Sequence, residues 1–286
     1  MPARPFAFNE RKPHGGPAGK HELLVCFMKR IFIPMVLLTG LFMARGEVKM
    51  ERVEYQDGDT VLEGWMARDT ALTGARPGVL IVHQWKGIGS GEKRRAEMLA
   101  KLGYVAFCAD IYGKGVRPTG NDQAAAEAGK YKKDRTVLRQ RVNAGLAALR
   151  RQPGVDSSHI AAIGYCFGGT TVLELARSGA DIAGVVSFHG GLDSPNRADG
   201  KQIKCKVLVL HGAEDPFVPA KDIEAFLNEL REAKVDWQMV NYGGAVHSFT
   251  DLDATGPGLK GAAYDEKADR RSWDAMKDFF SEIFAR

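Results

Sequence analysis

The body of this sequence has no excess of charge of either sign. The chain of 286 residues carries 40 Lys and Arg against 35 Asp and Glu, a formal charge of +5. Residues 1–46 hold seven basic and two acidic residues, which leaves 33 of each sign for the other 240. Proteins that bind nucleic acid or anionic membranes present a basic surface. The balance therefore gives no reason to expect such a partner.

Cysteine is also scarce, with four in the chain and no CxxC or Cys/His spacing of a metal site. We therefore expect no metal and no organic cofactor. Cys108 and Cys205 lie in apolar runs, "YVAFCAD" and "KCKVLVL", and are predicted to be buried structural thiols. Cys26 precedes the longest apolar run. Cys166 is different, because it lies among glycines in "IAAIGYCFGG".

No hydrophobic run is long enough to span a bilayer comfortably. The longest, "IFIPMVLLTGLFM" at 31–43, follows Met28-Lys29-Arg30 and precedes Ala44-Arg45-Gly46, the pattern of a signal peptide. We predict a signal peptide at residues 28–46, cleavage before Glu47, a periplasmic or secreted protein and no stable membrane insertion afterwards. A buried helix or a lone anchor is the alternative, with a cytoplasmic protein if 28–46 is not a signal. Residues 1–27 are predicted to be disordered, or untranslated if Met28 is the true start.

Strand and helix patterns alternate through the rest of the chain after a predicted hairpin at 51–68. Continuous apolar strands separated by amphipathic helices indicate a mostly parallel sheet with helices on both faces. We therefore predict one α/β domain over residues 47–286. The predicted strands are 78–83, 104–110, 159–165, 183–190, 206–212 and 235–242, and the predicted helices are 90–103, 134–151, 168–177, one from Pro219 and one around 273–283.

The stretch Gly164-Tyr165-Cys166-Phe167-Gly168 has the G-x-nucleophile-x-G form of a nucleophile elbow. Its glycines allow strand and helix to approach closely around a sharp turn, and it stands between a predicted strand and a predicted helix. A cysteine at a helix N-terminus is biased toward thiolate. We predict that Cys166 is a nucleophile. The alternative is a small buried residue in a tight turn.

A thiol nucleophile needs a base and an orienting acid, which in this fold follow in the order nucleophile, acid, histidine. Asp215 comes after the strand at 206–212, and Glu214 is a minority alternative. His247 follows the last strand, in "NYGGAVHSF". The histidines that end strands, His83, His189 and His211, are interpreted as structural or pocket-lining.

An oxyanion hole needs two backbone N–H donors. The first is predicted at Phe167, the residue after the nucleophile. The second is predicted at Trp85, in the loop after "GVLIVH". The Trp85 ring either walls the acyl pocket or belongs to the core.

With "HGAEDPFVP" and "GAVHSF", the elbow resembles the dienelactone hydrolase family of α/β-hydrolases over roughly residues 50–285. The resemblance implies a single-domain α/β-hydrolase fold and a small-molecule ester or lactone substrate. It also implies a cysteinyl thioester formed by Cys166, with His247 as base and acid and Asp215 as orienting carboxylate.

Two departures from the family pattern concern the substrate. The family's glutamate after the first core strand corresponds here to Gln84. The family also binds the substrate carboxylate with two arginines. The first falls near "DIYGKG", a stretch that contains Tyr112 and in which Lys114 replaces the arginine. The second corresponds to Asp251. We therefore expect a neutral ester, lactone or thioester as readily as dienelactone, with Gln84, Tyr112, Lys114 and Asp251 at the substrate. The alternative function is a non-hydrolytic thiol redox or ligand-binding protein on the same scaffold.

Overall fold

A computed structural model describes residues 46–255 and 258–285. Within them the chain forms an eight-stranded sheet in the order β1-β2-β4-β3-β5-β6-β7-β8. Strands β1 and β2 form the predicted antiparallel hairpin, β2 also pairs antiparallel with β4, and all further neighbours are parallel. The mostly parallel sheet predicted from the sequence is therefore confirmed. The strands are β1 Val48–Asp57, β2 Thr60–Asp69, β3 Arg76–Val82, β4 Val105–Ala109, β5 Val155–Tyr165, β6 Gly184–Phe188, β7 Lys206–Gly212 and β8 Trp237–Tyr242.

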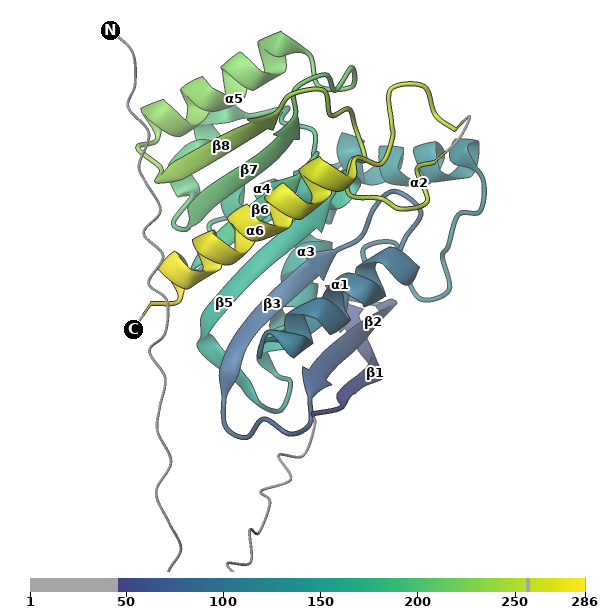
Figure 1. Ribbon diagram of the computed structural model, residues 1–286, viewed down its shortest axis with the longest axis vertical. Coiled ribbons are helices and arrows are strands. Elements are labelled where there is room, and N and C mark those ends of the chain that lie inside the picture. Colours follow the sequence, from purple (N-terminus) through teal and green to yellow (C-terminus); the bar gives the residue numbers. More distant parts are fainter. Residues whose placement is uncertain (1–45, 256–257, 286) are drawn as a thin grey trace, which may run out of the picture. The chain divides into compact units, whose positions relative to one another are not determined.

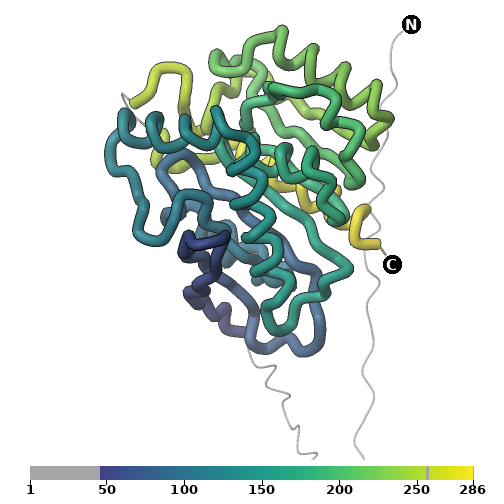
Figure 2. The backbone as a smooth tube through the Cα atoms, turned by 180° about the vertical axis from the view of Figure 1, so that it is seen from behind, coloured from purple at the N-terminus to yellow at the C-terminus, as the bar shows by residue number. Residues whose placement is uncertain are grey.

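Helices cover both faces of this sheet, as predicted. Helices α1 and α6 pack on one face, and Figure 1 shows them in front of the strands. The other face is covered by α3, α4 and α5, seen from behind in Figure 2. The helices are α1 Ser90–Lys101, α2 Asn121–Lys133, α3 Arg135–Arg150, α4 Phe167–Arg177, α5 Ala220–Glu232 and α6 Glu266–Ile283, with a 3-10 helix at Arg197–Gln202.

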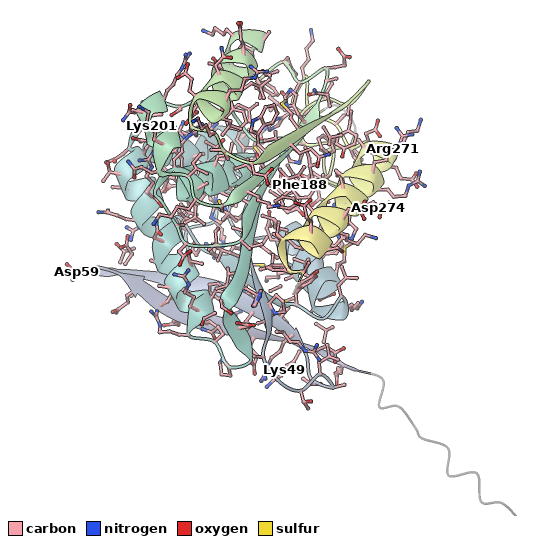
Figure 3. All side chains as sticks on the ribbon, turned by 90° about the vertical axis from the view of Figure 1, so that its left-hand side faces the viewer. Lys49, Asp59, Phe188, Lys201, Arg271 and Asp274 are labelled. Carbon is pink, nitrogen blue, oxygen red and sulfur yellow. The ribbon has the colours of Figure 1, made fainter. Side chains whose placement is uncertain are left out.

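The alternation of side chains along each strand builds two apolar cores, one under each helix layer. On β3, Leu80 and Val82 face the layer of α3 and α4, whereas Val79 and Ile81 face the layer of α1 and α6. Figure 3 shows the layers edge on, with Phe188 in the interior. Burial on both faces explains why these strands are continuous apolar runs in the sequence.

Aspartate side chains cap the N-termini of two helices, α3 and α6. The Asp134 side chain accepts the backbone N–H groups of Thr136 and Val137, each at 3.1 Å, and starts α3. Asp265 likewise accepts the Ala268 N–H at 2.8 Å and starts α6. Such caps satisfy donors that a helix leaves unpaired at its first turn.

Helix α2 and the 3-10 helix were not predicted from the sequence. The sequence of α2, "NDQAAAEAGKYKK", buries only Ala124, Ala128 and Tyr131. These positions have helical spacing, but two of them are alanines, so the apolar signal is weak.

The predicted extension at 1–27 and the predicted signal peptide lie outside the described residues, except Gly46. Across 46–255 and 258–285, no helix has the length and apolar character needed to cross a membrane.

Candidate active site

Four polar side chains from the sequence analysis lie where parallel strands end. Cys166 directly follows β5, His189 follows β6, Asp215 follows β7 by three residues, and His247 follows β8. Since the carboxyl ends of parallel strands share one edge of a sheet, these residues gather there although up to 81 positions separate them.

The turn between β5 and α4 has the geometry of a nucleophile elbow. Cys166 has a φ of 53°, a left-handed conformation that is strained for a residue with a side chain. A Cβ on Gly164 would lie 2.0 Å from the Gly168 carbonyl oxygen, and one on Gly168 would lie 2.2 Å from the Val82 carbonyl oxygen. Both glycines are therefore required by close backbone contacts, which lift Cys166 above the sheet edge.

Cys166, His247 and Asp215 form a continuous chain of contacts. The His247 Nε2 lies 3.0 Å from the Cys166 Sγ, and its Nδ1 lies 2.8 Å from the Asp215 Oδ2. The other oxygen of Asp215 accepts the Phe217 N–H at 2.9 Å, which fixes the carboxylate. Glu214, the alternative acid, is exposed at the surface, whereas Asp215 is buried against His247.

The electrostatic interactions among Cys166, His247 and Asp215 favour a thiolate–imidazolium pair. Burial alone would raise the pKa of the Cys166 thiol, but the charge and hydrogen bond of His247 outweigh it, so that the pKa lies below its usual value. Burial would lower the pKa of His247, but the Cys166 thiolate and Asp215 raise it to about 10. Each partner thus stabilises the charged form of the other.

His189 supports the elbow from the neighbouring strand. Its Nδ1 accepts the Cys166 backbone N–H at 3.1 Å, so its Nε2 carries the proton and donates to Thr250 Oγ1 at 2.8 Å. Burial and the nearby His247 hold the pKa of His189 well below its usual value. His189 is therefore a neutral structural histidine, which is one of the two roles that the sequence interpretation left open.

The remaining thiols of the described chain are poorly placed to react. Cys108 and Cys205 are both buried and free. Burial raises the pKa of Cys108 well above its usual value and that of Cys205 to about 12.

A cavity of about 740 Å³ opens beside the Cys166 sulfur, large enough for a drug-sized ligand. Phe167, Trp85 and His247 line it together with Cys166. The half-buried Trp85 lines the cavity and also packs against the core. Helix α2, which the sequence analysis missed, forms one wall with Asn121, Ala125, Ala128, Gly129 and Lys132.

Only two of the four predicted substrate residues reach this cavity. Gln84 and Asp251 line it, and the Gln84 side-chain N–H donates to the Asp251 carboxylate at 3.2 Å. Tyr112 lies behind the wall, where its hydroxyl donates to the Trp85 carbonyl at 2.9 Å. Lys114 forms an ion pair with Glu54 of β1.

The expectation that Lys114 replaces the family's arginine is therefore not supported by its position. The residues on the cavity wall include two other lysines, Lys86 and Lys132. The Lys132 charge acts on Cys166, where it helps to lower the pKa of the thiol. Sequence reasoning missed Lys132 because the helix that carries it was not predicted.

A family model with the description "Dienelactone hydrolase family" matches residues 62–284. This chain belongs to the dienelactone hydrolase family. Curated relatives of this chain carry the names probable lactonase and putative carboxymethylenebutenolidase, and the chain is accordingly a hydrolase of esters or lactones. The α/β-hydrolase fold expected from the sequence is confirmed by the solved structures that it matches.

Three proteins similar to this chain illustrate the range of the relatives it matches. The crystal structure of a dienelactone hydrolase-like promiscuous phosphotriesterase from metagenomic libraries is 43% identical, covers 84% of this chain and all of its own, and superimposes with a TM-score of 0.81. A probable 2-oxo-3-(5-oxofuran-2-ylidene)propanoate lactonase of Bradyrhizobium is 29% identical and covers 72% of this chain and 86% of its own. An uncharacterized protein of Caenorhabditis elegans is 37% identical over 52% of this chain and 95% of its own.

Proposed function

We propose that this member of the dienelactone hydrolase family cleaves a neutral carboxylic ester or lactone through a thioester on Cys166. The observation that carries the proposal is the contact chain from Asp215 through His247 to Cys166, with sulfur and imidazole 3.0 Å apart beside an open cavity. A paired thiolate and imidazolium supply both a nucleophile and an acid without any further proton transfer.

In the first half of the reaction, the Cys166 thiolate attacks the carbonyl carbon and the carbonyl oxygen becomes an oxyanion. The backbone N–H groups of Phe167 and Trp85, two residues that line the cavity, are the proposed donors to this oxyanion. The C–O bond then breaks, and the Nε2 proton of His247 goes to the leaving alkoxide. The thioester remains on Cys166, and His247 becomes neutral.

In the second half, neutral His247 removes a proton from water, and the resulting hydroxide attacks the thioester carbonyl. The second oxyanion collapses with cleavage of the C–S bond, which returns the thiolate next to the imidazolium. Asp215 accepts the Nδ1–H throughout and keeps Nε2 directed at the sulfur. Gln84 cannot take a proton at neutral pH, so in this proposal His247 is the base.

The test is hydrolysis of p-nitrophenyl acetate by the parent protein and by Cys166→Ala. We expect turnover with an initial burst of nitrophenol in the parent, and its loss in the variant. Cys205→Ala is the matched control, because that thiol is buried away from the cavity. Turnover that survives in Cys166→Ala would refute the mechanism. A parent that binds the ester without turnover would favour the non-hydrolytic alternative.

Phosphotriester hydrolysis is a second candidate, supported by the 43% identity to a promiscuous phosphotriesterase. A phosphotriester is neutral, as is the substrate proposed above, and it develops the same negative charge on an oxygen. We expect slow hydrolysis of paraoxon that disappears in Cys166→Ala. Equal rates in the parent and the variant would exclude it.

The location of the protein remains a separate proposal. We propose export, on the basis of the apolar run behind Met28-Lys29-Arg30. Mature protein from the native host should then begin near Glu47, as read by N-terminal sequencing. Intact residues 28–46 on the isolated protein would refute export.

A further inference from the structure

We propose that Glu92, the third residue of α1, is a positioning residue that fixes the loop carrying the Trp85 N–H. The inference rests on the proposed function, because it assigns Glu92 to the oxyanion hole proposed there. It adds a residue that neither the elbow motif nor the chain of contacts at Cys166 includes.

The two carboxylate oxygens of Glu92 hold both ends of this loop. The Oε1 accepts the Gln84 backbone N–H at 3.2 Å, and the Oε2 accepts the Gly89 backbone N–H at 2.8 Å. The loop from 85 to 88 lies between these anchors. Glu92 is only 4% exposed, although glutamate is almost never buried without partners.

Only one of these two contacts is explained by helix capping. A glutamate at the third position of a helix commonly accepts the N–H of the residue before the helix, which here is Gly89. The contact with Gln84 reaches five residues further upstream and satisfies no donor of α1. This second oxygen therefore acts on the loop.

The loop contacts fix three successive peptide planes around Trp85. Glu92 holds the N–H of the peptide before Gln84. The next peptide carries the Gln84 carbonyl and the Trp85 N–H, which point in opposite directions because the unit is planar. That carbonyl accepts from the His83 ring Nδ1 at 2.6 Å and from the Gly87 N–H at 3.1 Å. The following carbonyl, of Trp85, accepts from Tyr112.

Loss of one anchor should matter mainly when charge develops on the substrate oxygen. An oxyanion donor stabilises the transition state more than the neutral carbonyl of the ground state. In Glu92→Gln one oxygen still accepts, but the other becomes an NH₂ group that faces a backbone N–H. The loop must then shift, and we expect kcat to fall about 10-fold to 100-fold with KM within about 3-fold.

The experiment compares two reactions of the same sulfur in the parent and in Glu92→Gln. The first is hydrolysis of p-nitrophenyl acetate, which passes through an oxyanion. The second is alkylation by iodoacetamide, in which the thiolate displaces iodide from a saturated carbon and no oxyanion forms. The matched control is Glu97→Gln, at an exposed position of the same helix. A melting curve for each protein verifies that it is folded.

A fall in ester kcat of tenfold or more, with an alkylation rate within twofold of the parent, supports the proposal. Unchanged ester turnover overturns it. An equal fall in both reactions also overturns it, because Glu92 would then support the whole site rather than the oxyanion loop. If Glu92→Gln does not fold, Glu92→Asp is judged by the same two rates.

The proposed function fails separately from this inference. It fails when the parent shows no hydrolysis that depends on Cys166. The positioning role of Glu92 alone fails when the parent is active and Glu92→Gln is equally active.

Discussion

The charge of Asp251 should set the preference of this hydrolase between charged and neutral substrates. Asp251 lines the cavity beside Cys166 and is held there by the Gln84 side chain. The change to test is Asp251→Asn, which removes the charge and keeps an oxygen that can accept the Gln84 hydrogen bond. The substrates are a carboxylated lactone and its methyl ester, which differ by one negative charge.

The expected magnitude follows from Coulomb's law. Two unit charges about 6 Å apart repel by about 0.7 kcal/mol in water and by about 2.8 kcal/mol at an effective dielectric constant of 20. These energies correspond to about 3-fold and about 100-fold in relative affinity. The cavity is open to solvent, so we expect a value toward the lower end. High salt should reduce the effect, since exposed charges are screened.

The assay is the ratio of kcat/KM for the free acid to that for the methyl ester. Asp251→Asn should raise the ratio at least about 3-fold, and Lys132→Gln should lower it, since Lys132 also lines the cavity. Lys114→Gln is the matched control and should leave the ratio unchanged, because Lys114 pairs with Glu54. The reasoning is refuted if Asp251→Asn leaves the ratio unchanged or if Lys114→Gln alters it as much as Lys132→Gln does.

Four further predictions concern the same site. Iodoacetamide should alkylate Cys166 before Cys108 or Cys205, and the midpoint of its rate against pH should lie below the usual thiol pKa, because His247 outweighs the effect of burial on the pKa of Cys166. Ester turnover should fall near pH 10, where His247 loses the proton needed by the leaving group, and a profile that rises steadily to pH 11 would contradict the ion pair. Gly168→Ala should destabilise the fold by about 1–3 kcal/mol in urea denaturation through overpacking, whereas Gly129→Ala, with nothing within 4 Å, should not. Asp215→Asn should lower kcat by about 100-fold or more with the protein still folded. A decrease in kcat of less than threefold would mean that another residue orients His247.

The sequence predicted most of the fold because its signals are local. Apolar runs, caps and glycines gave every strand of the described sheet and all helices except α2 and the 3-10 helix. Helix α2 was missed because Ala124 and Ala128 give little amphipathic contrast. Its existence depends on packing against the core and against α3.

The sequence also predicted that the candidate site residues lie close together, because the carboxyl ends of parallel strands meet at one edge of the sheet, independently of the conformation of the loops. Each of the three residues follows a strand, so a correct prediction of the strands was enough to place them near one another. The residues are Cys166, Asp215 and His247. The choice between Asp215 and Glu214 needed side-chain direction, which adjacent positions in a loop do not reveal.

The sequence alone therefore determined the parallel sheet and the strand ends after which Cys166, Asp215 and His247 lie. Only the tertiary structure decided what surrounds the sulfur. Lys114 follows a strand, and Lys132 lies near the end of a helix. Lys114 pairs with Glu54, whereas Lys132 lines the cavity. The contacts of Gln84 with Asp251 and with Glu92 join segments separated by 167 and by eight residues. Such contacts depend on how loops fold over the sheet edge, where no periodic pattern constrains the chain.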